Sequence, residues 1–470
     1  MPLVRKTKIV CTIGPASASS EMQIELIKAG MNVARINFSH GSPEIYENRI
    51  NNLRDAVART GQSIAILADL QGPKIRVGEL ESEKIYLAKG SIVNATAEKI
   101  VGNARRFTIN YPSLIRDVGI GNTIFLDDGL LELKVIEVKE NDLVCSVEVG
   151  GELAQRKGVS LPGVAIDLPA VTEKDIEDIE FAVKSQVDYI AISFVRRAAH
   201  IKQVREILAQ YNANIDLVAK IESQEAVSHL DEIIAEADAV MVARGDLGVE
   251  IPAETVPIIQ REIIKKCNIA GKPVITATQM LESMKKSPRP TRAEVTDVAH
   301  AILDGTDAIM LSGETAVGEY PVDAVKVMNR TASVIEQSLS IDTSTYSSQN
   351  VSVAEAISHA TVQSANELNV VAIITSTQSG STAKQVAKYR PKAIVLAATP
   401  SDKVMRKLAL VWGVKPILVP RTADIDSMID VSVEAGRASG IIREGDMVAI
   451  TAGVKTDTPG STNLLKIHTV

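Results

Sequence analysis

Short apolar runs recur along the first part of the chain, and most are followed by a stretch with the apolar spacing of an amphipathic helix. The runs cover residues 7–14, 32–39, 63–70, 188–194, 216–223, 239–246, 273–280 and 308–314. The helical stretches cover residues 20–29, 43–59, 172–186, 197–210, 224–236, 254–270 and 291–304. Strands that alternate with helices form parallel sheets, and eight such units predict a closed (β/α)8 barrel of the TIM type.

The interval between Asp69 and Leu168 breaks this rhythm. It contains alternating, turn-rich segments such as TIFLDDG and LELKVIEV, and alternation with a period of two is typical of half-buried strands. We therefore expect a small β-barrel domain at residues 71–168, inserted into a barrel domain formed by residues 1–70 and 169–340. Loops at the C-terminal face of such a barrel lie over its active site, so the insertion is a candidate lid.

A second α/β pattern follows a polar segment. Residues 341–352 are rich in Ser and Thr, which indicates a linker. Beyond them, helical stretches alternate with apolar runs such as VVAIITS, AIVLAAT and MVAITAG. This alternation predicts an open α/β domain at residues 353–470.

Polar side chains gather at the ends of the predicted barrel strands. Because strand side chains alternate between faces, Lys220 and Glu222 share one face with the apolar Val218. The same alternation places polar residues last on other strands: Arg35, Asn37 and Ser39; Asp69; Arg244 and Asp246; Thr276 and Thr278; Ser312 and Glu314. A lone Lys-x-Glu would indicate a surface ion pair, but the repeated pattern predicts a barrel mouth built for chemistry.

The residue types at this mouth indicate the kind of chemistry. Glu222 and Asp246 fall on neighbouring predicted strands, and two carboxylates without His or Cys suit a hard ion such as Mg²⁺. Arg35, Arg244 and Lys220 are cations that suit a substrate bearing a phosphate or a carboxylate. Arg244 has a structural alternative, in which it bridges carboxylates and does not touch substrate.

Composition excludes several other classes. The 470 residues are 45% hydrophobic and 23% charged, which indicates a soluble protein of more than one domain. A net charge of −7 argues against a nucleic-acid or anionic-membrane partner. The three cysteines are widely spaced, as expected for reduced thiols. No signal peptide or segment of membrane-spanning length is evident, so we expect a cytoplasmic protein.

A series of longer motifs carries a resemblance to one family. They are TKIVCTIGPAS (7–17), GMNVARINFSHG (30–41), DLQGPKIR (69–76), LDDG (126–129), KGVSLPG (157–163), LPAVTEKD (168–175), LVAKIES (217–223), MVARGDLGVEIP (241–252), ITATQMLESM (275–284), PRPTRAEVTDVA (288–299) and DGTDAIMLSGETAVGEYP (304–321). On these motifs the chain closely resembles the pyruvate kinases, over its full length. We expect the C-terminal domain to be complete at Val470, as in bacterial members without an extra C-terminal domain.

The resemblance implies the last step of glycolysis, in which phosphoenolpyruvate gives its phosphoryl group to ADP and the resulting enolpyruvate is protonated. It implies that Glu222 and Asp246 hold Mg²⁺ or Mn²⁺. Lys220 would stabilise the transferring phosphoryl group and the enolate, and Arg35 would bind phosphoryl oxygens. The remaining implied residues are the backbone amides of Gly245 and Asp246 with Thr278 for the substrate carboxylate, and Thr278, or Ser312 through water, as the proton relay.

The same resemblance implies a nucleotide site beneath the lid. Arg76 and Lys157 would come from the two hinges of the inserted domain and reach the phosphates of ADP or ATP. Asn37 and His40 match further nucleotide contacts of the family. Taken by itself, His40 could equally be a loop histidine without a ligand.

A K⁺ site is a further feature of the family. Its ligand positions correspond to Asn37, Ser39, Asp69 and the carbonyl of Leu70. Lys74 stands where many members have glutamate, and its ammonium could replace the cation, so we expect that K⁺ is not required. The alternative is a solvated lysine in a hinge loop.

The C-terminal domain contains a small, hydroxyl-rich turn at the start of a helix, which is typical of a phosphate cradle. The resemblance implies a phosphorylated effector here, held by Thr377, Ser379, Gly380, Ser381 and Thr382, and it implies a homotetramer. The alternative for the turn is a plain Ser/Thr helix cap.

Two other functions compete with the kinase. A lysine in a barrel could form a Schiff base, which would make Lys220 the nucleophile of an aldolase. A metabolite sensor without activity would need a damaged site, and every position named above carries a competent residue.

Overall fold

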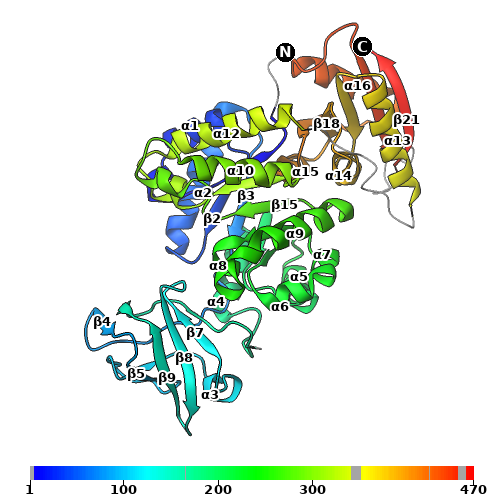
Figure 1. The fold of residues 1–470 in the computed structure, drawn as a ribbon. Helices are drawn as coiled ribbons and strands as arrows, with labels where there is room; N and C mark the ends of the chain where they lie inside the picture. The colour runs from blue at the N-terminus through cyan, green and yellow to red at the C-terminus, as the bar shows by residue number, and fades with distance from the viewer. Residues whose placement is uncertain (1–4, 165, 340–350, 423, 454–461) are drawn as a thin grey trace.

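The computed structural model describes residues 5–164, 166–339, 351–422, 424–453 and 462–470. The chain forms a central barrel with a β domain at one end and an α/β domain at the other (Figure 1). The barrel is closed by eight parallel strands in the order β1-β16-β15-β14-β13-β12-β3-β2, which confirms the predicted fold. Their bounds are β1 Lys8–Thr12, β2 Val33–Asn37, β3 Ala65–Asp69, β12 Tyr189–Ile192, β13 Asp216–Ile221, β14 Ala239–Ala243, β15 Val274–Ala277 and β16 Ala308–Leu311.

Helices surround this barrel, and several begin at the caps that the sequence supplies. Thr172 and Thr291 form capping boxes with Asp175 and Glu294, which satisfy the free N–H groups at the starts of α4 and α10. The helices are η1 Pro15–Ser17, α1 Ser20–Ala29, α2 Pro43–Thr60, α4 Glu173–Lys184, α5 Ala198–Gln210, α6 Gln224–Ser228, α7 Leu230–Glu236, α8 Arg244–Glu250, η2 Ala253–Thr255, α9 Val256–Ala270, η3 Glu282–Lys285, α10 Arg292–Leu303, α11 Gly313–Ala316 and α12 Pro321–Gln337.

The barrel interior corrects the predicted faces of two strands. On β14, Ala239 and Met241 pack inside the barrel, while Val240 and Val242 pack against the helices. On β15, Ile275 likewise points inward. Strands buried on both faces are apolar throughout, so the two-residue period shows which residues share a face but not which face is inside. Strand β14 also ends at Ala243, so Arg244 and Asp246 lie in the first turn of α8.

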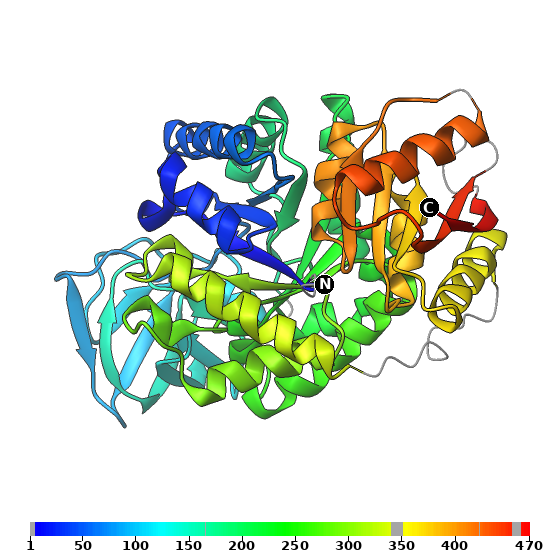
Figure 2. The same cartoon turned by 90° about the horizontal axis from the view of Figure 1, so that it is seen from above.

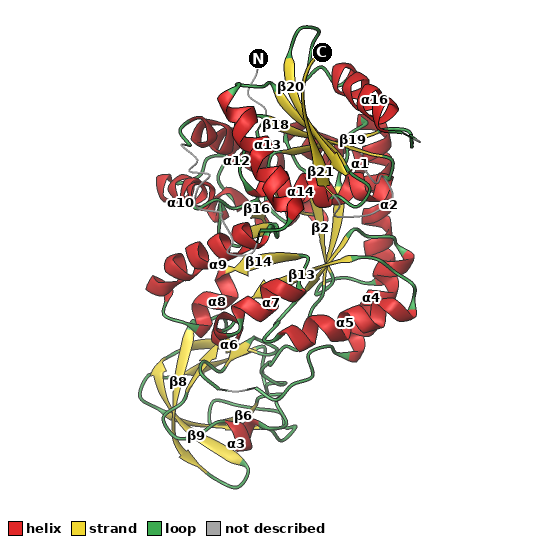
Figure 3. Cartoon of the chain, turned by 90° about the vertical axis from the view of Figure 1, so that its right-hand side faces the viewer, coloured by secondary structure: helices red, strands yellow, loops and turns green. Residues whose placement is uncertain are grey.

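The inserted domain is built from two sheets around its own core (Figure 3). A six-stranded sheet has the order β11-β7-β8-β9-β5-β6, and a second sheet pairs β10 with β4. The bounds are β4 Lys84–Leu87, β5 Ile92–Thr96, β6 Arg106–Thr108, α3 Leu114–Asp117, β7 Thr123–Leu126, β8 Leu131–Val138, β9 Asp142–Val149, β10 Gly151–Ala154 and β11 Val159–Ser160. The predicted small β domain is thus confirmed, while its limits at 71 and 168 stay predictions.

The C-terminal domain is a five-stranded sheet, β19-β18-β17-β20-β21, in which only β21 runs antiparallel. Figure 2 shows it beside the barrel. The elements are α13 Val353–Glu367, β17 Ala372–Ser376, α14 Ser381–Lys388, β18 Ile394–Thr399, α15 Asp402–Lys407, η5 Leu408–Leu410, β19 Val414–Leu418, α16 Ile425–Ala438, β20 Met447–Gly453 and β21 Thr462–Thr469. Residues 341–350 of the predicted linker lie outside the described residues.

The barrel and the C-terminal domain share a hydrophobic core. Ala409 and Leu410 of the C-terminal domain belong to the apolar cluster inside the barrel, and both are buried. Polar contacts surround them: Arg390 pairs with Asp307 at 3.2 Å, and the Tyr189 hydroxyl donates to the carbonyl of Lys407 at 2.6 Å. The end of the barrel at which the strands begin is therefore closed by the C-terminal domain. In the described part of the chain, no helix is long and apolar enough to span a membrane.

Candidate active site

Lys220 is the centre of a charged cluster at the other end of the barrel. Its ammonium lies 2.9 Å from Glu222 Oε1 and 3.2 Å from Asp69 Oδ1, and it donates to Ser193 Oγ at 2.7 Å. Only 12% of the lysine side chain is exposed. Burial would lower the pKa of Lys220, but Asp69, Glu222 and Asp246 raise it above its ordinary value. The side chain is therefore a fixed cation.

Arg35 approaches the same carboxylate from strand β2. Its Nε and Nη2 both lie 2.7 Å from Asp69 Oδ2, and its Nη1 donates to Thr12 Oγ1 at 2.8 Å. Asp69 is 1% exposed, and burial alone would raise its pKa. The neighbouring Lys220 and Arg35 hold the pKa of Asp69 below its ordinary value. Two predicted substrate cations are thus anchored on one buried anion.

The two predicted metal ligands lie together at this mouth. Glu222 is 1% exposed, and its Oε2 accepts a hydrogen bond from the Phe194 amide at 2.6 Å. Asp246 is exposed to the cleft in the first turn of α8. Burial raises the pKa of Glu222, Lys220 lowers it, and the negative charge of Asp246 raises it further.

This repulsion between two hard-oxygen donors is what a divalent cation would relieve, so the residues fit such an ion. Among the described residues, no group of three His, Cys, Asp or Glu side chains is arranged to hold a metal. Substrate oxygens and water would therefore have to complete the coordination around Glu222 and Asp246.

Thr278 and Gly245 come together from neighbouring strand ends. The Gly245 amide donates to Thr278 Oγ1 at 2.8 Å, and Thr278 has a positive φ of 69°. Arg244 braces this turn: its guanidinium donates to the carbonyls of Ala277 and Thr278 and pairs with Asp297 at 2.6 Å. These contacts support the structural alternative for Arg244. Ser312, at the end of β16, donates its backbone N–H to buried Glu314.

A cleft of about 760 Å³ separates the inserted domain from the barrel mouth. His40, Arg76 and Lys157 line it together with Glu222 and Asp246, so the predicted nucleotide and metal residues share one cavity. In this structure Lys157 pairs with Asp127 at 2.9 Å, and Arg76 donates to the carbonyl of Arg156 at 2.9 Å.

Cationic side chains gather around His40 on one side of the cleft. Burial, then Lys74, Arg76 and Arg35, lower the pKa of His40 below its ordinary value. The side of the cleft around His40 is therefore rich in positive charge.

The predicted K⁺ positions also cluster, and two of their oxygens already accept hydrogen bonds. Asn37 lies opposite Asp69 on the paired strands β2 and β3, and its Oδ1 accepts from the Ser39 amide at 3.0 Å. The Leu70 carbonyl accepts from Ser193 Oγ at 2.7 Å. Lys74 is exposed at the rim of the same cleft.

The predicted effector turn is held together by its own side chains. Thr377 Oγ1 accepts from the Gly380 amide at 2.9 Å, and the Thr382 and Thr462 hydroxyls lie 2.8 Å apart. Gly380 has a φ of 85°, which favours glycine, and it caps the start of α14. Ser379 is exposed, and Ser381 opens the helix.

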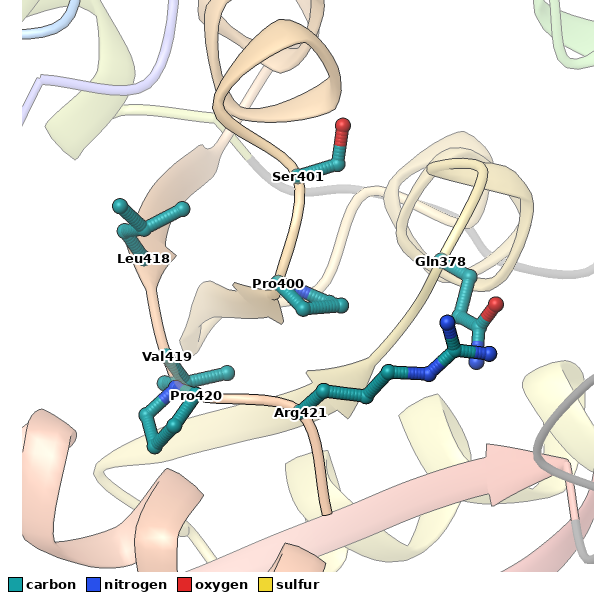
Figure 4. A pocket seen from close by; sticks show the side chains of 7 residues that line it. All are labelled: Gln378, Pro400, Ser401, Leu418, Val419, Pro420 and Arg421. Carbon is teal, nitrogen blue, oxygen red and sulfur yellow. The ribbon is translucent and has the colours of Figure 1, made fainter. Parts of the chain in front are cut away.

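A cavity of about 580 Å³ lies beside this turn at the carboxyl ends of β17, β18 and β19. Figure 4 shows Arg421 reaching across it toward Gln378, which belongs to the turn. Pro400, Leu418 and Pro420 supply apolar walls. The turn is thus next to a space large enough for a small molecule.

Two residues that contact the predicted cations were not found from the sequence. Ser193 contacts Lys220, and Thr12 contacts Arg35. Both fit the two-residue alternation that identified Lys220. Ser193 lies two positions after the inward-facing Ala191, and Thr12 lies two positions after the inward-facing Val10. Applying the alternation to the first and fourth strands would have identified them.

Comparison with known proteins finds one family in two parts of the chain. Residues 4–325 match the family model described as pyruvate kinase, barrel domain, and residues 355–468 match pyruvate kinase, alpha/beta domain. The pyruvate kinase of Geobacillus stearothermophilus is 51% identical, over 99% of this chain and 80% of its own length. That of Bacillus licheniformis is 48% identical, over 99% and 81%. A crystal structure of a pyruvate kinase from Cryptosporidium parvum superposes with a TM-score of 0.94 at 40% identity, covering 99% of this chain and 96% of that one.

Proposed function

The chain belongs to the pyruvate kinase family and is a phosphotransferase, and from that premise we propose how its cleft transfers a phosphoryl group from phosphoenolpyruvate to ADP. The observation that carries the proposal is the ammonium of Lys220, held between Asp69 and Glu222, the second of which lines the cleft. A permanent cation at this point stabilises negative charge that develops on the transferring group and on the departing enolate.

The residues around Lys220 would each bind one part of the reactants. Arg35, oriented by Asp69 and Thr12, would hold phosphoryl oxygens. The turn formed by Gly245, Asp246 and Thr278 would receive the substrate carboxylate. In the described structure the Gly245 amide binds Thr278 Oγ1, so the substrate would have to exchange for or share that contact.

Glu222 and Asp246 would hold Mg²⁺ or Mn²⁺. When bound, such an ion supplies a second positive charge that neutralises phosphoryl and enolate oxygens. The Phe194 amide orients Glu222 by donating to its Oε2 at 2.6 Å. The proton for the enolate would come from Thr278, or from Ser312 through water.

The nucleotide would lie beneath the inserted domain. Arg76 and Lys157 come from its two connections to the barrel, and both line the cleft beside His40. On closure they would leave Asp127 and the Arg156 carbonyl for the phosphates of ADP. Closure would also exclude water, which otherwise competes for the phosphoryl group.

The aldolase alternative is disfavoured by the charge on Lys220. A Schiff base requires a neutral amine, and nucleophilic lysines have a lowered pKa. Here the carboxylates raise the pKa of Lys220. The sensor alternative requires a damaged site, whereas the cation and carboxylate positions are filled.

A coupled assay tests the proposal. Phosphoenolpyruvate and ADP should yield pyruvate, measured by lactate dehydrogenase, only when a divalent cation is present. In parallel, borohydride with pyruvate should leave Lys220 unlabelled. No pyruvate under any divalent cation, or a covalent label on Lys220, would reject it.

We further propose regulation by a phosphorylated metabolite at the turn of residues 377–382, assembly as a homotetramer, and independence of K⁺ through Lys74. The adjacent cavity supports the first, and the position of Lys74 at the rim of the cleft supports the last. Light scattering of the purified protein would test the tetramer.

A further inference from the structure

A two-residue corner follows strand β12 and contacts both Lys220 and Glu222. Ser193 is 2% exposed, and Phe194 has a φ of 54°, which is uncommon for a residue other than glycine. Gly72 packs tightly against the corner, since a Cβ at Gly72 would lie 2.8 Å from Ser193 Cβ. The corner is therefore held in one conformation by its surroundings.

The hydrogen bonds of Ser193 have a fixed direction. Lys220 Nζ lies 2.7 Å from Ser193 Oγ, and an ammonium can only donate. Leu70 O lies 2.7 Å from the same Oγ, and a carbonyl can only accept. The serine proton consequently points to Leu70, and a lone pair points to Lys220. Ser193 has no proton to exchange with a substrate while both bonds persist.

The three N–H groups of the Lys220 ammonium all face protein oxygens, but the contacts are unequal. The contact with Asp69 Oδ1 is the longest at 3.2 Å, and Oδ1 is otherwise without a hydrogen-bond partner among the described residues. Glu222 is the proposed metal ligand. Binding of reactants would therefore alter the contacts of Lys220 with Asp69 and Glu222. The Ser193 hydroxyl, which is bonded to neither carboxylate, would keep its hydrogen bond to Lys220.

We propose that Ser193 is a positioning residue for phosphoryl transfer: its hydroxyl holds the Lys220 ammonium in place while the contacts with Asp69 and Glu222 change. The inference rests on the proposed function, since it concerns where the lysine charge stands in the transition state.

Thr12 has the same arrangement toward the second cation. Its Oγ1 accepts from Arg35 Nη1 at 2.8 Å and donates to the Leu311 carbonyl at 3.0 Å. Both hydroxyls thus connect a cation of the site to a backbone carbonyl of a neighbouring strand. The repetition indicates that the hydroxyl–carbonyl bridge is the means by which the barrel orients its cations.

Ser193→Ala tests the role. The value of kcat should fall about 10- to 100-fold, as expected for loss of a hydrogen bond to a charged group. The KM for phosphoenolpyruvate and the affinity of the substrate-free enzyme for Mn²⁺, measured by electron paramagnetic resonance, should change less than about threefold. A fall in Mn²⁺ affinity that parallels kcat would overturn the proposal, because the corner would then act through Glu222.

Ser432→Ala is the matched control, since Ser432 is a buried serine that donates to the Met428 carbonyl at 2.7 Å far from the cleft. It should lower the melting temperature without changing kcat. If Ser193→Ala likewise changes only the melting temperature, Ser193 is structural and the proposal fails.

Thr12 provides an independent test should Ser193→Ala not fold. Thr12→Val should reduce kcat/KM for phosphoenolpyruvate at least about tenfold, and Thr12→Ser should restore it. Equal activity of Thr12→Val and Thr12→Ser would show that the hydroxyl–carbonyl bridge does not orient Arg35. A wild type without activity would instead reject the proposed function, and it would do so before any variant is compared.

Discussion

Lys220 Nζ lies 2.9 Å from Glu222 Oε1, so the proposed catalytic cation and a proposed metal ligand are in direct contact. Lys220→Met removes the cation and keeps most of the side-chain volume. We expect kcat to fall by a factor of several hundred, or ~3–4 kcal/mol in the transition state, with little change in substrate affinity. Stopped-flow assays and calorimetry check this, with the exposed Lys202→Met as control. An unchanged kcat with a raised KM would show that Lys220 does not stabilise the transition state.

The metal site is tested by charge removal. Glu222→Gln and Asp246→Asn each delete one formal charge from a hard-ion site and should raise the Mg²⁺ concentration for half-maximal rate about tenfold or more. Glu225→Gln is the matched control, because Glu225 lines the same cleft but pairs with Arg197. If Mg²⁺ titrations of both variants coincide with that of the control, the metal lies elsewhere.

The monovalent-cation prediction concerns Lys74. Lys74 lines the cleft with an exposed side chain, and its charge contributes, after burial, to the lowered pKa of His40. We expect full activity without K⁺ and a K⁺ requirement in Lys74→Glu, since that change moves the local charge by two units. Assays with tetramethylammonium at constant ionic strength measure it. A wild type that is inactive until K⁺ is added contradicts the prediction.

The effector turn should be separable from catalysis. Ser379→Ala with Ser381→Ala should abolish activation by sugar phosphates or AMP and leave the basal rate unchanged, because the turn belongs to the C-terminal domain. Adding Thr382→Ala should give the same loss of activation and also lower the melting temperature, since Thr382 contacts Thr462. Loss of the basal rate in the double variant would indicate misfolding and not loss of an effector site.

Lys8 predicts a pH dependence of stability. It is buried between the barrel and the C-terminal domain, where its Nζ donates to the Val414 carbonyl at 2.6 Å. Burial lowers its pKa to about 7, and the charged groups around it are Arg5, Glu336, Lys415 and Asp307. Between pH ~7 and the ordinary pKa of a lysine, Lys8 carries a proton in the unfolded chain and not in the folded chain. Stability is therefore lost as pH falls through this window.

Lys8→Met removes that dependence. The free energy of unfolding of the wild type, relative to the variant, should rise from pH 7 to pH 10 by at most about 1.4 kcal/mol per pH unit. Urea denaturation at several pH values measures the difference, with Lys202→Met as control. Parallel curves for wild type and Lys8→Met would show that Lys8 keeps its charge on folding.

The sequence predicted the barrel because its strands are buried and short, and the helices between them have caps. It predicted Lys220, Glu222, Arg35 and Asp69 because polar residues in buried strands are rare. It assigned the wrong face to β14 and β15, since both faces of those strands are buried. The specific side-chain partners could not be predicted: that Arg244 braces the turn at Thr278 depends on carbonyls of the neighbouring strand.

The closure of the barrel by Ala409 and Leu410 has a consequence for how the chain can be divided. The barrel strands, the inserted domain and the proposed metal ligands all precede residue 340, so a shortened gene could encode every group that we propose to touch the reactants. Its product would nevertheless lack the two apolar residues that close the barrel interior, and Asp307 would lose its ion pair with Arg390. The domain that we propose to sense a metabolite also closes one end of the barrel. Evolution could change what that domain binds, but deleting it would expose the centre of the enzyme to solvent.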